Sequence, residues 1–351
     1  MTPKELHAAA LASVRHVLVE SDATFELLLA ALVVGGNVLI EGMPGTAKTL
    51  MARALAQLLD GPGETEAVAR GAVLDAGQQT TAQTPTQRAP AMAPAGARFQ
   101  RIQFTPDLMP SDIVGTNVFN MQTSSFSLRP GPIFANIVVA DEINRAPAKT
   151  QSALLEAMEE RQVTIEGHRL TLPPVFMVVA TQNPVEFEGT YPLPEAQLDR
   201  FLFKLAIEYA SAPAERDIVL LHHRGFRITD LEEAGLQPVV DERGLLEVRA
   251  QVGAVTVDTT VADYIVRVQR ETRTAPEVQY GASVRGGIGM LNGSKAIAAF
   301  AGRDYVTPDD VKAVAAPVLR HRIVLKPEAE LDGVRPDDVI SRILAHVPVP
   351  R

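Results

Sequence analysis

Cysteine is missing from the 351 residues. The chain therefore has no disulfide bond, no thiolate zinc site and no cysteine nucleophile. Long apolar runs are missing too, because the longest, near Ile133–Ala140 and Val175–Ala180, fall far short of the ~20 residues of a membrane helix. The N-terminus, with Lys4, Glu5 and Arg15, lacks the uninterrupted apolar core of a signal peptide. We expect a cytoplasmic protein without a membrane segment.

Positive charge is in short supply. The chain has 33 Lys and Arg against 42 Asp and Glu, which gives a formal net charge of −9. Non-specific binding of nucleic acid depends on Lys and Arg that neutralise phosphates, so this balance disfavours a nucleic-acid partner, although it leaves room for a local basic channel. Hydrophobic residues make up 46% of the chain, which is enough for a sizeable core, and the length predicts two or three domains.

Strand-type and helix-type patterns alternate in the first part of the chain. Continuous apolar runs, typical of strands buried on both faces, alternate with helical patterns such as Lys48–Leu59 and Thr150–Glu160. This alternation predicts an α/β domain over residues 1–207, with a parallel sheet flanked by helices. Later patterns are helical and predict a second domain over residues 208–351, in which Thr307 and Asp310 form a candidate N-cap box. The predicted strands are Asn37–Ile40, Phe99–Phe104, Ile137–Ala140, Val175–Ala180 and Phe201–Ile207, and the later helices are Asp258–Arg273, Ser283–Phe300, Thr307–Leu319 and Asp337–His346.

Residues 61–98 differ in composition from the rest of the chain. They are rich in Ala, Pro, Gly, Thr and Gln, and they contain no aromatic residue. Such a segment buries too little apolar surface to offset the entropy lost on ordering. We expect a disordered, low-complexity insertion inside the α/β domain, and a partner-binding loop is the alternative.

A glycine-containing loop lies where the first strand gives way to a helix. It runs from Gly42 to Thr49 with the sequence GMPGTAKT. In a phosphate-binding loop, backbone N–H groups wrap the phosphates, Lys48 reaches the β- and γ-phosphates, and Thr49 holds Mg²⁺. The strict pattern has Gly in place of Ala47, whose methyl group is tolerated at negative φ. The alternative is a plain glycine turn followed by a chance Lys-Thr pair.

Two further strand ends carry polar side chains. Asp141 and Glu142 follow an apolar strand, where a carboxylate can hold the Mg²⁺ of a bound nucleotide and the adjacent Glu can polarise the attacking water. Taken alone, an acidic strand end entering a loop explains this pair equally well. Asn183 follows the next buried strand, level with Asp141 if the strands are neighbours, and there its amide would orient the water or the γ-phosphate. A turn before Pro184 is a compatible alternative.

Longer stretches of the sequence point to a family. In chain order they are FTPDLMPSD (104–112), GPIFAN (131–136), ADEINRA (140–146), QSALLEAM (151–158), ATQNP (180–184) and GTYPLPEAQLDRF (189–201). With these stretches the chain resembles the MoxR branch of the AAA+ ATPases over nearly its whole length, except residues 61–98. A series of matches in the right order is more specific than any single nucleotide motif.

The resemblance implies an AAA+ P-loop NTPase core and a C-terminal, all-helical lid. It identifies Asp141 and Glu142 as Walker B, Asn183 as sensor 1, and Thr49 with Asp141 as the Mg²⁺-binding pair. In this family Ala47 is the usual residue at its position. The Walker A segment that would bind ATP comprises Gly42, Met43, Pro44, Gly45, Thr46, Ala47, Lys48, Thr49 and Leu50.

Two arginines receive a role only through the resemblance. Arg200 looks like the arginine finger, which reaches into the ATP site of the next subunit and stabilises charge on the transferring phosphoryl group. A solvated or ion-paired surface arginine is the alternative for Arg200. Arg285 looks like sensor 2, contacting the γ-phosphate from the lid, and an exposed first-turn arginine is its alternative. The family usually has Pro where this chain has Val284.

The implied activity is Mg²⁺-dependent hydrolysis of ATP to ADP and phosphate in a homo-oligomeric ring, a hexamer by resemblance. The implied role is chaperone-like remodelling or maturation of a client, for which the family commonly works with von Willebrand factor A-domain proteins and in metal-cofactor insertion. Two alternatives remain: a nucleic-acid-acting ring ATPase, and a nucleotide-gated scaffold with negligible turnover. The intact Lys48, Asp141, Glu142 and Asn183 disfavour the scaffold.

Two other segments look like inserts of this family. Gly115–Gly131, with Phe119 and Phe126, takes the place of a helix-2 insert, and Val163–Pro174 looks like the hairpin before sensor 1. Such hairpins line a pore in related rings, whereas a solvated turn is the favoured explanation for the residues 166–169, including His168 and Arg169. The adjacent His222 and His223 would diverge on a helix, so we expect no metal site there.

Overall fold

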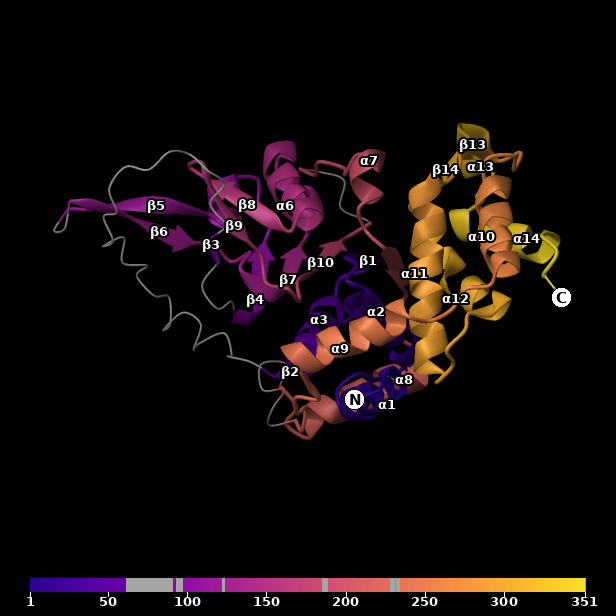
Figure 1. Ribbon diagram of the computed structural model, residues 1–351, viewed down its shortest axis with the longest axis horizontal. Coiled ribbons are helices and arrows are strands. Elements are labelled where there is room, and N and C mark those ends of the chain that lie inside the picture. Colours follow the sequence, from indigo (N-terminus) through magenta and orange to yellow (C-terminus); the bar gives the residue numbers. More distant parts are fainter. Residues whose placement is uncertain are drawn as a thin grey trace.

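The computed structural model of the protein describes residues 1–60, 91–92, 97–121, 124–184, 189–227, 231 and 234–350. Its centre is a five-stranded sheet in the order β11-β1-β10-β7-β4, and all neighbouring strands are parallel (Figure 1). This confirms the predicted parallel sheet. The strands are β1 (Val38–Gly42), β4 (Ala97–Gln103), β7 (Ala135–Asp141), β10 (Met177–Gln182) and β11 (Phe203–Ile207).

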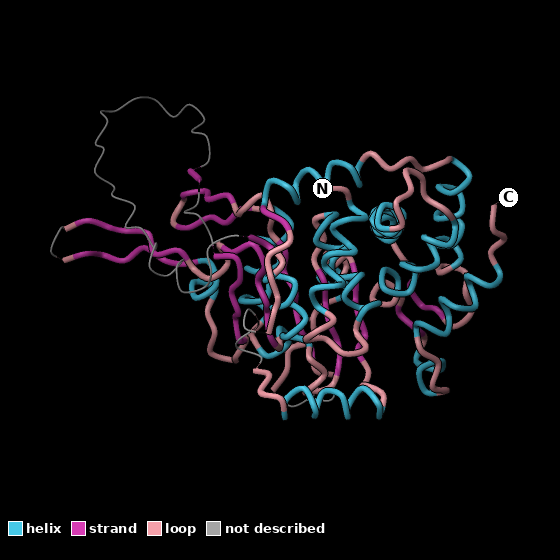
Figure 2. Tube along the Cα trace, turned by 90° about the horizontal axis from the view of Figure 1, so that it is seen from below, coloured by secondary structure: helices cyan, strands magenta, loops and turns pink. Residues whose placement is uncertain are grey.

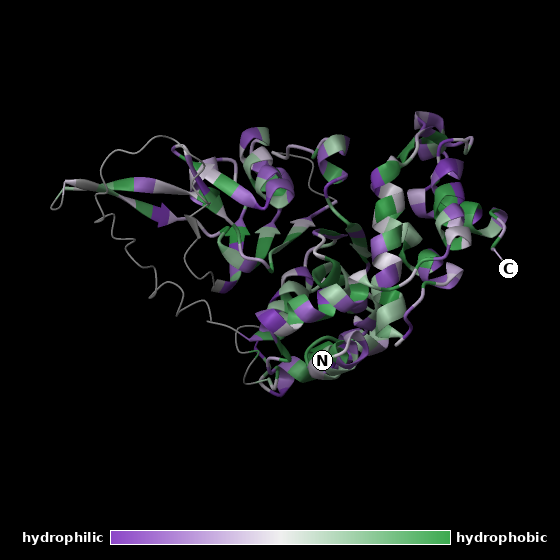
Figure 3. Ribbon diagram, in the orientation of Figure 1, coloured by the Kyte–Doolittle hydropathy of each residue, from purple (hydrophilic) through white to green (hydrophobic). Residues whose placement is uncertain are grey.

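Helices cover both faces of the sheet. Successive side chains of a strand point to opposite faces, so Ile137 of β7 packs into the core under α2 (Asp22–Val34) and α3 (Lys48–Gln57). The next residue, Val138, packs on the other side against α6 (Ala148–Glu160). Because both faces are covered, the central strands β7 and β10 contain continuous apolar runs, coloured green in Figure 3.

The C-terminal helices form a separate group, seen at the right of Figure 1. Thr307 and Asp310 make the predicted capping box at the start of one of these helices. The group consists of α10 (Thr259–Glu271), α11 (Val284–Phe300), α12 (Pro308–Leu319), α13 (Pro327–Leu331) and α14 (Pro336–His346).

The residues after 207, predicted to begin the second domain, include a helix that packs against the α/β domain. Helix α9 (Glu242–Gly253) lies against α2, and its Arg249 donates hydrogen bonds to the carbonyls of Leu32 and Val33 at the end of that helix. Helices α8 (Ala212–His223) and α1 (Pro3–Val14) lie on the same side of the sheet (Figure 1). The segment that follows β11 therefore packs first on the α/β domain, and the helical group begins near α10.

The shorter elements include two antiparallel hairpins. The pair β5 (Gly115–Asn120) and β6 (Ser125–Pro130) extends away from the body of the molecule (Figure 2), and β8 (Gln162–Ile165) pairs with β9 (His168–Thr171), as predicted for 163–174. The remaining elements are α5 (Pro110–Val114), η1 (Ile143–Arg145), α7 (Glu195–Leu198), β2 (Leu59–Asp60), β12 (Val240–Asp241), β13 (Val278–Tyr280) and β14 (Val324–Leu325). Among the described residues, no helix combines the length and apolar character needed to cross a membrane.

The predicted C-terminal boundary of the insertion, residue 98, is wrong. Strand β3 (Ala91–Met92) pairs with β9, and β4 already begins at Ala97, so part of 61–98 belongs to sheets. The sheet neighbour β7 supplies hydrogen bonds that the composition of the segment could not reveal. Residues 61–90 and 93–96 lie outside the described residues.

Arg322 joins the helical group to the α/β domain. Its guanidinium donates to the Asp199 carboxylate at 2.7 Å and to the carbonyl oxygens of Phe201 at 2.7 Å and Leu202 at 3.2 Å. Only 4% of its side chain is exposed. A buried arginine with this many acceptors fixes the segment between α7 and β11 against the end of α12.

The neighbouring His321 is buried at the same junction. Its Nε2 lies 3.0 Å from the Phe201 carbonyl oxygen and must donate to it, while Nδ1 has no partner among the described residues. Burial lowers the pKa of His321 well below its usual range, and the adjacent Arg322 cation lowers it further. The folded protein therefore holds this imidazole neutral.

We predict that His321 makes the fold sensitive to acid. Below pH ~6.5 the unfolded chain binds a proton at His321 that the folded chain does not, so the free energy of unfolding falls as pH falls, by at most about 1.4 kcal/mol per unit. The variant His321→Gln keeps a donor for Phe201 but does not titrate. Thermal unfolding of both proteins between pH 8 and 5 should show the wild type losing more stability. Parallel pH curves would contradict the prediction.

Candidate nucleotide-binding site

The glycine-containing loop connects β1 directly to α3. Gly42 closes the strand, and a Cβ there would lie 2.9 Å from the Ile207 carbonyl oxygen, so glycine is required. Gly45 has φ +84°, and no atom of the described part of the chain lies within 4 Å of where its Cβ would be. Lys48, the first residue of α3, donates from Nζ to the loop carbonyl of Met43 at 2.9 Å. The loop thus forms an open cradle in front of a helix N-terminus, an arrangement that favours anions.

Ala47 departs from the expectation of a negative φ. It adopts φ +58° and ψ +20°, the left-handed conformation, immediately before α3. For an L-residue other than glycine this conformation costs roughly 1–2 kcal/mol, so the loop is strained at the position where the strict pattern has Gly. The strain turns the chain sharply enough for Lys48 to begin the helix.

The acidic strand end lies opposite the loop. Asp141 ends β7 and is buried, and its carboxylate accepts from Thr49 Oγ1 at 3.2 and 3.3 Å. Thr181 of β10 donates to the same carboxylate at 2.8 Å and accepts the Glu142 backbone N–H at 3.0 Å. Glu142 has φ +55°, a strained conformation that functional sites commonly retain.

Strand β4 supplies two residues that the sequence analysis did not single out. Arg101 Nε lies 2.6 Å from Asp141 Oδ2, and Gln103 donates to Glu142 Oε2 at 2.7 Å. The two side chains also bond to each other at 2.9 Å. A lone Arg or Gln carries no signal in one sequence, and only the pairing of β4 with β7 brings them to the carboxylates. Thr181 was missed for the same reason.

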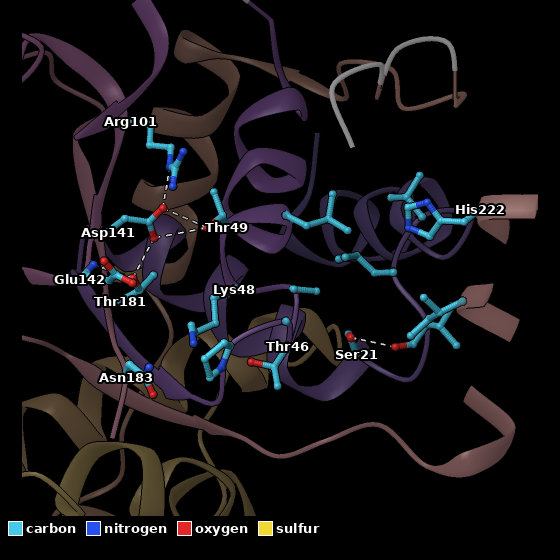
Figure 4. Close-up of a pocket in the computed structure, with 18 of the residues that line it drawn as sticks. Ser21, Thr46, Lys48, Thr49, Arg101, Asp141, Glu142, Thr181, Asn183 and His222 are labelled. Carbon is cyan, nitrogen blue, oxygen red and sulfur yellow. Dashed lines mark hydrogen bonds and ion pairs between the residues drawn. The ribbon is translucent and has the colours of Figure 1, made fainter. Parts of the chain in front are cut away.

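These residues line one cavity of about 450 Å³ (Figure 4). Its polar end contains the loop, both carboxylates and Asn183, and its other end is apolar. Sequence reasoning did not anticipate the apolar end, which joins the α1–α2 connection to α8. A molecule that combines an apolar ring system with a polyanionic tail fits this division. The apolar lining consists of Val17, Leu18, Val19, Ile218, Leu221 and Phe226, with the His222 ring edge-on to Phe226.

Comparisons with known proteins agree with this arrangement. The AAA family of ATPases associated with various cellular activities matches residues 73–203, the AAA lid domain matches 270–343, and the MoxR domain of the MoxR–vWA–β-propeller ternary systems matches 4–70. Chaperone MoxR1 of Mycobacterium tuberculosis is 39% identical over 97% of this chain and 82% of its own length.

This chain belongs to the MoxR family of AAA+ ATPases. The uncharacterized protein YeaC of Bacillus subtilis is 42% identical, over 99% of this chain and 97% of its own. The solved structure of a candidate ATPase from Cytophaga hutchinsonii has a TM-score of 0.81 at 36% identity, over 99% of this chain and 96% of that one. The AAA match begins at residue 73, inside the predicted insertion, so the family resemblance extends further than the sequence analysis assumed.

The two arginines assigned through the family lie outside the cavity. Neither Arg200 nor Arg285 is among the residues that line it. Arg200 instead donates to the Leu155 carbonyl at 2.6 Å and pairs with Glu159 at 3.0 Å, and Arg285 pairs with Glu159 at 3.0 Å. Arg285, predicted to contact the γ-phosphate from the lid, thus lies away from the cavity of its own subunit. Ser283 at the start of its helix donates to Asp199, ahead of β11, whereas the loop follows the C-terminal end of β1.

The two predicted inserts form exposed hairpins. Phe119 and Phe126 face each other across β5 and β6 with ring centroids 5.1 Å apart, and both rings are largely exposed. At the β8–β9 turn Gly167 has φ +84°, as expected, and Glu166 also has a positive φ of 47°. His168 is exposed there, and Glu166 accepts a hydrogen bond from Asn117 of β5 at 2.7 Å.

We predict that Ala47→Gly stabilises this MoxR-family protein by up to about 1 kcal/mol, because relief of the left-handed strain exceeds the entropy that glycine adds to the unfolded chain. The control Ala8→Gly changes an exposed alanine inside α1, where glycine should destabilise by roughly 0.5–1 kcal/mol. Urea unfolding of both variants measures the contrast. Equal destabilisation by the two changes would contradict a strained Ala47.

Proposed function

We propose that this MoxR-family protein hydrolyses ATP to ADP and phosphate. One observation carries the proposal: Lys48 and Thr49 at the start of α3 lie across a single cavity from Asp141 and Glu142 at the end of β7. The apolar end of the cavity would take the adenine ring, and the cradle of loop N–H groups would take the phosphates.

Each of the residues that line the cavity would have a different role in hydrolysis, according to its position. Lys48 would exchange its bonds to loop carbonyls for the β- and γ-phosphates, to which a charged donor binds more strongly. Glu142 would act as the general base that orients and deprotonates the attacking water, with Gln103 holding its carboxylate. Asn183, at the wall of the same cavity, would orient the water or the γ-phosphate.

The donor set fits magnesium. Thr49 offers a hydroxyl and Asp141 a carboxylate, hard oxygen ligands that already lie 3.2 Å apart, and the remaining positions suit water and phosphate. Thr49 and Asp141 would hold Mg²⁺ together with the nucleotide, and the ion would supply positive charge that offsets the charge of the phosphates.

We further propose that the protein works as a homo-oligomeric ring, a hexamer by family resemblance. Arg200 and Arg285 lie outside the cavity of their own subunit, which supports action on the nucleotide of a neighbour. A heterologous, head-to-tail interface that closes on itself would bring these arginines of one copy to the cavity of the next.

The work done by hydrolysis is proposed to be remodelling or maturation of a client protein. The match to the MoxR domain of MoxR–vWA–β-propeller systems supports a von Willebrand factor A-domain partner, and the name of the M. tuberculosis relative supports a chaperone role. We propose metal-cofactor insertion as one form that this maturation would take.

We predict that Lys48→Ala and Glu142→Gln fail at different steps. Lys48→Ala should weaken ATP binding about 10- to 100-fold, since hydrogen bonds to charged groups contribute about 1.5–3 kcal/mol. Glu142→Gln should bind ATP normally but lower turnover by about 10²- to 10⁴-fold, because it removes the base. Titration with a fluorescent ATP analogue and phosphate-release kinetics measure the two. Equal nucleotide affinity in the wild type and Lys48→Ala would overturn the loop assignment.

We also predict that Arg200→Ala lowers turnover by about 10³-fold or more while leaving ATP affinity within about twofold. The defect should be repaired in trans. In a random equal mixture with Glu142→Gln, about a quarter of the interfaces pair an intact Arg200 with an intact Glu142, so about a quarter of wild-type turnover should return. Near-normal turnover of Arg200→Ala alone would make Arg200 a surface ion-pair residue.

A further inference from the structure

Two arginines from different domains share one carboxylate. Arg200 follows α7 in the α/β domain, and Arg285 is the second residue of the lid helix α11. Glu159, near the end of α6, pairs through Oε2 with Arg200 Nη2 at 3.0 Å and through Oε1 with Arg285 Nη2 at 3.0 Å. Each oxygen of the carboxylate serves one guanidinium, so the two cations are held side by side.

A second carboxylate fixes the lid side of this arrangement. Asp199 accepts from Arg322 through Oδ1 at 2.7 Å and from Ser283 Oγ through Oδ2 at 3.2 Å, and Oδ2 also lies 3.9 Å from Arg285. Ser283 caps α11 through the Arg285 N–H. The start of the lid helix is therefore tied to the segment that carries Arg200, and Figure 1 shows α7 beside that end of α11.

The charges in this cluster do not balance. Three guanidinium groups, those of Arg200, Arg285 and Arg322, face two carboxylates, so these five side chains leave one positive charge uncompensated. Arg200 is 29% exposed and Arg285 52%, whereas Arg322 is buried. Each guanidinium has five N–H groups, more than the bonds to Glu159 use, so both exposed arginines can take a further anion without leaving the carboxylate.

We infer that Glu159 is a positioning residue that holds Arg200 and Arg285 together as a two-arginine clamp for the phosphates of a neighbouring copy. The inference rests on the proposed hydrolysis in a ring, and it adds the residue that couples the lid arginine to the finger. Without Glu159 the two like charges repel, and each side chain regains rotamer freedom. Misplacement of such groups by about 1 Å costs about 10²-fold in rate.

The first test separates turnover from nucleotide affinity. Glu159→Ala should lower kcat about 10- to 100-fold and leave the affinity of the subunit's own site for a fluorescent ATP analogue within about twofold. Glu159→Gln, which keeps one acceptor but not the charge, should lose less. The matched control is Glu160→Gln, an exposed neighbour on the same helix for which no ion pair is found among the described residues; it should stay within about twofold of wild type. Wild-type kcat in Glu159→Ala and Glu159→Gln would overturn the inference.

The second test assigns Glu159 to a face of the subunit. Mixed with Glu142→Gln, Glu159→Ala should regain about a quarter of wild-type turnover, because some interfaces combine an intact clamp with an intact base. Mixed with Arg200→Ala it should regain nothing, because both changes damage the same donating face and no interface has a whole clamp. Recovery in this second mixture would place Glu159 in its own subunit's site and overturn the inference.

The mixture of Arg200→Ala and Glu142→Gln separates failure of the inference from failure of the proposed function. Suppose that this mixture recovers turnover, but the Glu159→Ala mixtures do not give the results expected above. The proposed hydrolysis in a ring is then supported, and the proposed role of Glu159 is wrong. If the wild type shows no turnover, or the Arg200→Ala mixture does not recover, the proposed function fails and the clamp falls with it.

Discussion

Strand β10 lies between β1 and β7 and pairs with both. The register of these two pairings determines that the polar residues after the three strands lie at the same edge of the sheet. Ala180 of β10 pairs with Ala140 of β7, so Thr181 stands level with Asp141 and reaches its carboxylate at 2.8 Å. On the other side Glu41 pairs with Gln182, which brings the end of β1 and the phosphate-binding loop to the same edge. A shift of one residue in either pairing would turn Thr181 or Asp141 to the opposite face and separate the carboxylates from the loop.

Two of the six non-glycine residues with positive φ in the described part of the chain lie at this edge of the sheet. Ala47 and Glu142 both take left-handed conformations, one before α3 and the other directly after β7. Each turns the chain sharply at the point where a side chain must face the cavity, and the covered sheet behind them supplies the packing that holds the strain. From β4, at the edge of the sheet, Arg101 then compensates the charge of Asp141, and Gln103 donates a hydrogen bond to Glu142. The site is consequently an assembly of four strand ends rather than of one motif.

The residues of the proposed site lie in two groups on different surfaces of the subunit. The cavity is lined by the loop, the acids and Asn183, while Arg200 and Arg285 meet at Glu159, near the end of α6. Arg322 connects the second surface to the lid through Asp199 and the carbonyls after it, and His321 is buried beside that joint. Movement of the lid would therefore act on the arginines directly, because Arg285 and the anchor of the Arg200 segment belong to the same helical group.

The sequence by itself determined the local features: the strands of the sheet, the loop from Gly42 to Thr49, the acids at the end of β7 and the capping box at Thr307 all follow from spacing and residue type over a few positions. Only the tertiary structure decided the positive φ of Ala47, the start of β4 inside the predicted insertion, and the lining of the apolar end of the cavity. It alone revealed Arg101, Thr181 and Glu159, and it alone placed Arg285 away from its own cavity. The physical reason is that these features depend on contacts between segments distant along the chain: a side chain acquires its partner from the strand or helix packed beside it, and one sequence without that packing contains no signal for the pairing.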